Sequence, residues 1–313
     1  MSRGIKRLWI AIGGIFVAGV ALAAIGFTFG GSGSAWIDRD GLHFGNPETS
    51  TKEFVDKESD SFDNVDVELI AADVELVVGS SYGYELTYTG RNEPTIEVSG
   101  NTLRVIEKDD IWSINFFGWR NSLSSQAKLT VYVPSKTVLD KVSLSTASGD
   151  TVLSGKKVGI KDLHCQSASG SVTLNDLELE QLMLEVVSGD VKISTVSAES
   201  ATINMVSGKL ICTDAITDNL VVDMVSGSAR VQGTIAQSLV INTVSGDADF
   251  DLTGNKDDYS FSFDRISGDI KVDGRSIDGL TGADATDTNT QGKRSGRIEI
   301  DTVSGSVNIN FKE

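Results

Sequence analysis

Residues 182–193 read LMLEVVSGDVKI, and this stretch decides the fold because its pattern recurs along the last two-thirds of the chain. The central Ser-Gly dipeptide has in-register copies at Gly149, Gly170, Gly189, Gly208, Gly227, Gly246, Gly268 and Gly305. The steps between these glycines are 21, 19, 19, 19, 19, 22 and 37 residues. A period of this size predicts a stack of similar supersecondary units rather than one globular core.

Apolar residues recur at fixed offsets on both sides of each glycine. Five residues before it stand Leu144, Cys165, Leu184, Ile203, Val222, Ile241, Phe263 and Ile300. Four residues after it stand Leu153, Leu174, Ile193, Cys212, Val231, Phe250, Val272 and Ile309. Polar residues alternate with them, which indicates strands with one buried face. A looser third side follows, where several coils also carry an apolar residue, such as Val196, Ile216 and Ile235.

A unit of 19 residues is too short for two strands and a helix, so the pattern predicts an all-β fold, a parallel β-solenoid with coils of about 19 residues. Each coil is expected to lie on the previous one at about 4.8 Å, so that equivalent residues form ladders. Glycine suits the corner because a positive φ costs little without a Cβ atom. The period does not decide the handedness of the solenoid.

The repeat becomes irregular toward the N-terminus. Residues 65–76 keep its spacing with Ala72 in place of the glycine, which predicts a degenerate first coil. Ser99-Gly100 lies between two short alternating runs and predicts a hairpin turn. We therefore expect a β cap region over residues 61–138 and the solenoid repeats over residues 139–313.

The N-terminal residues predict a membrane anchor. Arg3, Lys6 and Arg7 precede an apolar run over residues 8–30, long enough to span a bilayer. The positive-inside rule then places residues 1–7 in the cytoplasm as a stub, and the C-terminal domain outside the cell membrane. Residues 31–60 read as a polar stalk. A cleaved signal peptide ending near Ala23 is the alternative, although its apolar region is normally shorter.

Charge and cysteine content limit the partners. The formal net charge of −17 argues against a nucleic-acid partner. Solubility alone also explains such a charge. Cys165 and Cys212 fall in inward columns two coils apart, an axial offset of about 9.6 Å that exceeds disulfide reach. We expect two buried free thiols.

Two kinds of functional site were considered from the sequence, a Ca²⁺ site and the active site of a carbohydrate-active enzyme. Aspartates after the corner glycines suggest Ca²⁺, but serine or lysine separates most of them, and Asp247 and Asp269 are the one pair expected on adjacent coils. A carbohydrate-active β-helix enzyme needs two carboxylates in a cleft, and no pair stands out. His43 and His164 are isolated along the sequence. We therefore expect no enzyme activity, catalytic residue, metal or cofactor.

Two insertions interrupt the repeat. Residues 109–126 carry the aromatics Trp112, Phe116, Phe117 and Trp119. Exposed, these side chains would bind a partner, whereas buried they would close the end of the core. The second insertion, residues 273–295, is polar and rich in Gly, Asp and Thr.

The opening AADVEL and the repeated blocks at residues 187–191, 244–247, 266–270 and 303–307 resemble a bacterial family. This is the "putative adhesin" domain-of-unknown-function family of Gram-positive envelopes, which includes LiaG-like proteins and is related to the toast-rack class. The resemblance covers about residues 60–313. It implies an extracellular β-solenoid with a role in adhesion or envelope stress, and it supplies no catalytic residues.

The sequence thus predicts a single-pass membrane protein whose extracellular domain is a non-enzymatic interaction module. Its expected partners are the lipid bilayer, through residues 8–30, and an envelope protein or glycan. The alternatives are a carbohydrate-active enzyme acting on envelope polysaccharide and a calcium-dependent structural stalk.

Overall fold

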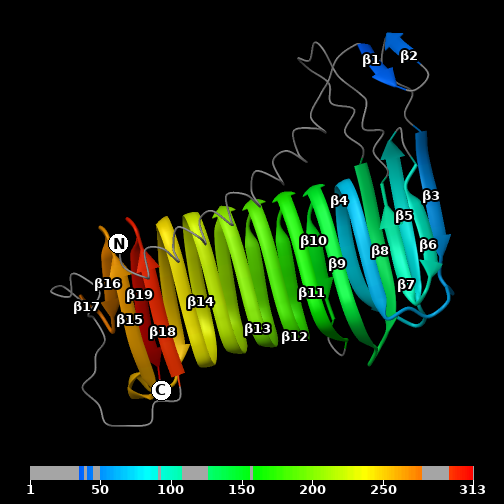
Figure 1. The fold of residues 1–313 in the computed structure, drawn as a ribbon. Coiled ribbons are helices and arrows are strands. Elements are labelled where there is room, and N and C mark those ends of the chain that lie inside the picture. The colour runs from blue at the N-terminus through cyan, green and yellow to red at the C-terminus, as the bar shows by residue number, and fades with distance from the viewer. Residues whose placement is uncertain are drawn as a thin grey trace.

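The structure, a computed structural model, describes residues 35–38, 41–44, 50–90, 93–107, 126–155, 158–276 and 296–312. Two strands form a separate antiparallel pair, β1 (Ala35–Asp38) and β2 (Gly41–Phe44). All the others form one sheet that winds into a long stack (Figure 1). They are β3 (Ser50–Asp56), β4 (Asn64–Gly79), β5 (Gly83–Gly90), β6 (Thr95–Ser99), β7 (Thr102–Ile106), β8 (Gln126–Pro134), β9 (Val138–Ser148), β10 (Thr151–Ser154), β11 (Gly159–Ser169), β12 (Val172–Ser188), β13 (Val191–Ser207), β14 (Lys209–Thr253), β15 (Tyr259–Arg265), β16 (Asp269–Val272), β17 (Arg275–Ser276), β18 (Gly296–Thr302) and β19 (Ser306–Lys312). Among the described residues the single helical element is the 3-10 turn η1 (Lys256–Asp258).

Successive coils pair in parallel with a register shift of one repeat, as the sequence predicts. Leu184 lies beside Ile203, and Ile203 lies beside Val222. Three sides make up each coil of the regular region, and they are separated by residues that do not pair. In the coil of β12, for example, Asp176 and Glu180 interrupt the ladder between its sides, and Asp176 has a left-handed φ of 53°. The predicted looser third side is therefore a three-residue strand segment.

The interior is filled by the predicted apolar columns. Leu184, Ile203, Val222 and Ile241 are each at most 1% exposed, as expected for the minus-five column. Cys165 and Cys212 are buried and free, which confirms the prediction for both thiols. Their burial raises the pKa of each thiol to about 12, so neither is a nucleophile at neutral pH.

The apolar residues of the third side do not all face the core. Val196 and Ile235 are buried, but Ile216 is 60% exposed. Ile216 pairs with Ser197 rather than with Val196, so it stands in the outward column of the short side. A side of only three residues between two corners is too short for the sequence to determine which of its residues face the core.

The N-terminal end does not follow chain order. On one side β4 pairs with β9 and β10, and on the other side it pairs with β7 and β8. The coil around Ala72, predicted as degenerate, is therefore an interior coil. β6 and β7 form the predicted hairpin with Ser99 opposite Thr102. β3 pairs antiparallel with β5, so this part of the predicted stalk belongs to the sheet.

The C-terminal end is also out of order. β18 and β19 pair with β14 on one side, and with β15 and β16 on the other. Figure 1 shows this last coil between the coil that precedes it in the sequence and β14. The coil of β15 and β16 is thus the outermost one. Tyr259, Phe261 and Phe263 of this coil form an aromatic cluster with Phe311 of β19, and the ring centroids of the contacting pairs lie 5.4–6.2 Å apart.

Within the described ranges no helix is long and apolar enough to cross a membrane. The predicted stub and anchor, residues 1–30, lie outside the described residues. So do the aromatic positions 112–119 and most of the second insertion.

Candidate interaction surfaces

The corner glycines form a ladder that leaves no room for a side chain. A Cβ atom on Gly170, Gly189 or Gly208 would lie 2.0 Å from the carbonyl oxygen of the corner residue one coil earlier. A left-handed φ, by contrast, occurs at four of the eight positions, namely Gly149, Gly208, Gly227 and Gly268. Glycine is therefore needed chiefly because the coils approach closely at this corner, and only at some positions because of its φ.

The aspartates after the corner glycines bind the backbone of the next coil. Asp150 Oδ1 accepts from the amide of Ser171 at 2.9 Å, and Asp190 Oδ1 accepts from the amide of Lys209 at 3.1 Å. Asp247 Oδ1 accepts from the amide of Ser306 at 3.3 Å. These carboxylates thus satisfy corner amides, a structural role that accounts for the Ser-Gly-Asp motif.

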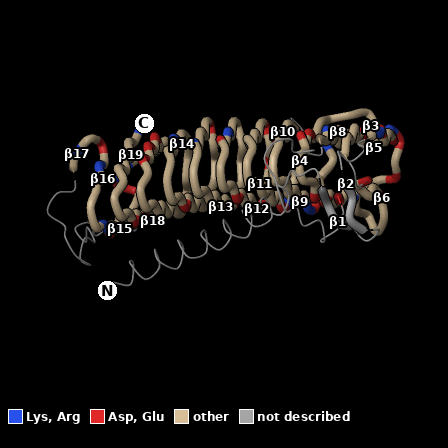
Figure 2. The backbone as a smooth tube through the Cα atoms, turned by 90° about the horizontal axis from the view of Figure 1, so that it is seen from above, with Lys and Arg blue, Asp and Glu red and all other residues tan. Residues whose placement is uncertain are grey.

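Asp247 and Asp269 are not neighbours, contrary to the prediction. Ser306 pairs with both of them, because the last coil lies between theirs. Within the described residues no three His, Cys, Asp or Glu side chains come together in a way that could hold a metal ion. Figure 2 shows acidic residues along the edges of the stack with basic residues interspersed among them.

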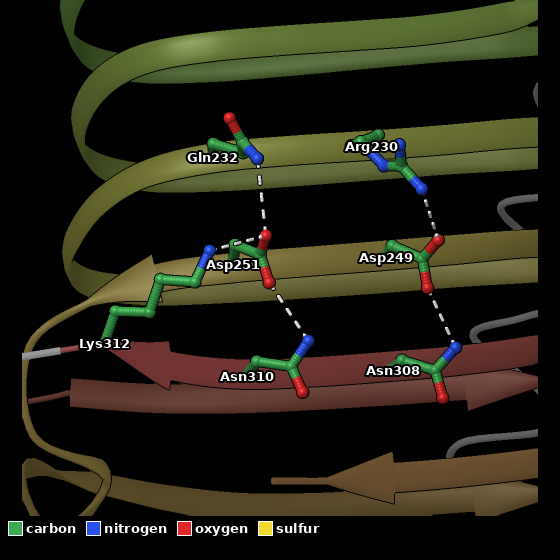
Figure 3. Close-up of polar contacts among 7 residues, drawn as sticks. All are labelled: Arg230, Gln232, Asp249, Asp251, Asn308, Asn310 and Lys312. Atoms are coloured by element: carbon green, nitrogen blue, oxygen red, sulfur yellow. Dashed lines mark hydrogen bonds and ion pairs between the residues drawn. The ribbon is translucent and has the colours of Figure 1, made fainter. Parts of the chain in front are cut away.

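The face that follows the glycine corner carries a polar ladder near the C-terminal end (Figure 3). Asp249 accepts from Arg230 at 3.5 Å and from Asn308 at 2.8 Å. Asp251 accepts from Gln232 at 3.3 Å, and from Asn310 and Lys312 at 3.0 Å each. The hydrogen bond from Asn310, followed by that from Lys312, lowers the pKa of Asp251. Both carboxylates therefore hold three successive coils together.

The face that precedes the corner carries a second polar row. Glu185 accepts from Gln166 Nε2 at 2.5 Å, and His164 Nε2 lies 3.3 Å from Glu185 Oε2. The hydrogen bond with His164 is the largest cause of a lowered Glu185 pKa. Sequence reasoning missed this pair, although offsets of minus six and minus four on adjacent coils place the two side chains diagonally on one face.

Asp223 occupies the same row in a less favourable setting. Burial raises its pKa, and the hydrogen bond that Asn242 donates at 2.5 Å opposes the rise. Its other neighbour in register, Asn204, has a buried side-chain oxygen with no hydrogen-bond partner. An ionised Asp223 cannot supply that oxygen with a donor, whereas a protonated one can.

An apolar column runs beside this polar row on the outside of the stack. It consists of the residues two before the corner, Ile70, Ala147, Ala168, Val187, Val206, Val225, Val244, Val303 and Ile266. Ile266 is 60% exposed at the C-terminal end, and the others are half-buried. The face therefore offers a straight apolar edge next to hydrogen-bonding groups.

The solved structures that match this chain have low sequence identity to it. A "putative adhesin" from Bacteroides fragilis is 13% identical with a TM-score of 0.45, over 85% of this chain and 98% of that one. A "putative lipid binding protein" from Parabacteroides distasonis is 18% identical with a TM-score of 0.38, over 86% and 98%. A "putative cell adhesion protein" from Clostridium sporogenes is 12% identical with a TM-score of 0.28, over 85% and 100%.

No curated protein matches the sequence. The family model described as Toastrack DUF4097 matches residues 62–310, which include nearly all of the coils. The protein therefore belongs to the Toastrack DUF4097 family.

Proposed function

We propose that the protein is a non-enzymatic adhesion or envelope-stress module, anchored in the cell membrane by residues 8–30 and exposed outside the cell. The observation that carries the proposal is the use of the polar side chains. The carboxylates of Asp150, Asp190, Asp249 and Asp251 all accept hydrogen bonds from neighbouring coils. A rod that uses its carboxylates to join its coils suits display of a surface better than catalysis.

The partner-binding patch is proposed to lie at the N-terminal end of the rod. β7 ends at Ile106 beside Glu68, and β8 begins near Ala127 beside Ala72. The residues between them therefore replace the tight corner in the coil next to β4. This segment contains Trp112, Phe116, Phe117 and Trp119. It is longer than the corner of a regular coil, so it distinguishes this end of the rod from the repeats.

Affinity capture from native cells tests this proposal. The full-length chain is cross-linked on intact cells and purified with its partners, in parallel with a variant that carries serine at the four aromatic positions. We expect the variant to lose the captured partner while its far-UV β spectrum and melting temperature stay unchanged. Equal capture by both proteins would contradict the proposal, and unfolding of the variant would show that the four aromatics are core residues.

Membrane attachment is tested separately. We expect the full-length chain to stay in the membrane pellet after alkaline carbonate extraction and to be cleaved by protease added outside intact cells. Removal of residues 8–30 should release it. Recovery of the intact chain as a soluble protein would contradict the anchor.

The enzyme alternative has a direct assay. New reducing ends after incubation of the protein with envelope glycans would support a carbohydrate-active enzyme and contradict the adhesion proposal.

A further inference from the structure

The C-terminal coil, formed by β18 and β19, fills a slot between two coils that are connected to each other. One neighbour is the last coil of β14, and the other is the coil of β15 and β16. Only residues 254–258 join these two neighbours, and η1 lies within that connection. The step of 22 residues between Gly246 and Gly268 thus carries the chain past one additional layer. The slot is built before its occupant is reached in the sequence.

Side chains match this coil to the slot. Ile298, Ile300, Val307 and Ile309 are each 0% exposed and continue the interior columns. Outside, the β14 wall presents Asp247, Asp249 and Asp251, and the coil supplies donors to them, namely the amide of Ser306, the side chains of Asn308 and Asn310, and the ammonium group of Lys312. Direct stacking of the β16 coil on β14 would instead bring Asp269 beside Asp247, and like charges on adjacent strands are unfavourable.

A long connection tethers this coil to the rest of the chain. Nineteen residues lie between Ser276 and Gly296, which is enough to reach about 65 Å when extended. The contacts in the slot come from strand pairing, core packing and the Asp–Asn pairs. None of these contacts requires that the coil and the slot belong to the same chain.

We propose that the C-terminal coil is an exchangeable element, which a second copy of the protein can donate into the slot. Exchange of an identical element between two copies preserves every native contact and costs mainly the freedom lost on association. This proposal does not depend on the adhesion function. It gives neighbouring copies in one envelope a way to join by their C-terminal ends.

The tether sets the concentration at which exchange occurs. Because the coil is attached to its own chain, its effective concentration at its own slot is taken as about 1 mM, the order expected for a short linker. A second copy at about 0.1 mM should therefore occupy about a tenth of the slots, and one at about 1 µM about a thousandth. Folding at high local concentration is the condition that favours exchange.

Two variants of the full-length chain, each with one cysteine added to the buried native pair Cys165 and Cys212, test this. Ser238 and Arg297 are in register on neighbouring strands, and strands in such a pair lie about 4.8 Å apart, which is within disulfide reach. Chains with Ser238→Cys and chains with Arg297→Cys are refolded together in detergent under reducing conditions and oxidised only after folding. We expect disulfide-linked dimers of the two variants, at about a hundredfold higher yield at 0.1 mM than at 1 µM.

Three controls make the result decisive. The double variant S238C/R297C should form its disulfide within one chain at low concentration, which checks the register. Each single variant alone, and the two variants mixed after separate folding, should give no dimer. Absence of mixed dimers at 0.1 mM, with the double variant still linking internally, would overturn the proposal. Where the chain does not refold from denaturant, co-expression of the two variants in one cell gives the same comparison.

Discussion

Gly189 is closed to any side chain because the preceding coil lies too near, and this gives a test at the scale of one residue. A Cβ atom there would lie 2.0 Å from Gly170 O, and a backbone atom cannot move aside as a side chain can. We expect Gly189→Ala to destabilise the solenoid by about 1–3 kcal/mol, as overpacking does. The melting temperature should fall by about 2–4 °C for each kcal/mol.

Gly159→Ala is the matched control. The nearest side-chain atom to a Cβ on Gly159 is Val138 Cγ2 at 3.5 Å, which is an ordinary contact. Its melting temperature should be unchanged or slightly raised, since alanine restricts the unfolded chain. Equal loss in both variants would show that the corner contact is not the cause.

Asp223 predicts a pH dependence of stability. Burial raises its pKa in the folded protein, whereas an unfolded Asp has a pKa of about 3.9. The folded state therefore binds the proton more tightly, and the free energy of unfolding falls as pH rises from about 4 through the raised pKa. Asp223→Asn removes this loss and supplies an amide donor beside Asn204. We expect a higher melting temperature than wild type at pH 7.5 and a smaller difference at pH 4.

Asp251→Asn should behave in the opposite way. Asn310 and Lys312 lower the pKa of Asp251, so its ionised form contributes stability above the unfolded pKa, and that contribution is lost as pH falls through the lowered pKa. The variant should melt below wild type at pH 7.5 and approach it in acid. If both aspartate variants change the melting temperature in the same direction, the assignment of opposite pKa shifts is wrong.

Single residues were predictable from sequence where a column repeats, and less so where two columns meet. The burial of Cys165 and Cys212 follows from one offset counted along the chain. The His164–Glu185 contact joins two different offsets on different coils, so it requires the coil-to-coil register. The corner carboxylates were considered as Ca²⁺ ligands, whereas their bonds to amides depend on backbone directions that side-chain periodicity does not contain.

At the scale of the element, the contrast between Ile203 and Ile216 tests the coil. Ile203 is 1% exposed in a long side, and Ile216 is 60% exposed in the short one. Ile203→Ala should cost about 2–5 kcal/mol because it leaves a cavity. Ile216→Ala should change the free energy of unfolding by less than about 0.5 kcal/mol. Urea melts of the two variants check this, and a comparable loss at both positions would mean that Ile216 is a core residue.

The two long sides of each coil were predictable because four to seven residues of alternation fix which face is buried. The three-residue side was not, because one apolar residue next to a corner fits either phase. Ile216 and Ile235 both follow their glycines by eight residues, yet Ile216 is 60% exposed and Ile235 is buried, so the offset from the glycine does not decide which face a residue of this side takes. The sequence around Ala72 likewise predicted how this coil aligns with the repeat, but not which strands lie on each side of β4.

At the scale of the whole molecule, periodicity predicted the stack but not the order of its coils. The inward columns do not specify an order, since similar apolar residues such as Ile241, Ile300 and Ile309 recur at their interior positions. The outer face differs between the coils, because the inserted coil supplies hydrogen-bond donors to Asp247, Asp249 and Asp251, whereas the β16 coil would place Asp269 beside Asp247. The irregular steps of 22 and 37 residues were the available signal. The first connection must cross the position that the last coil later fills, and the second must return to it, so both need additional residues.

A charge exchange between Asp251 and Asn310 tests the order of the coils. The two residues are in register and bonded at 3.0 Å, although they are 59 positions apart. Asn310→Asp should place two carboxylates side by side and destabilise the protein by about 1 kcal/mol at neutral pH, less at high salt. Combining it with Asp251→Asn restores one acid and one amide, so the double variant should recover about 0.5–3 kcal/mol of coupling in urea melts. In a stack that followed chain order, the coil of β15 and β16 would lie between Asp251 and Asn310. The effects of Asp251→Asn and Asn310→Asp on the free energy of unfolding would then be additive. Additivity within error would therefore contradict the inserted coil, whereas recovery would establish in solution that the end of the chain lies inside the stack.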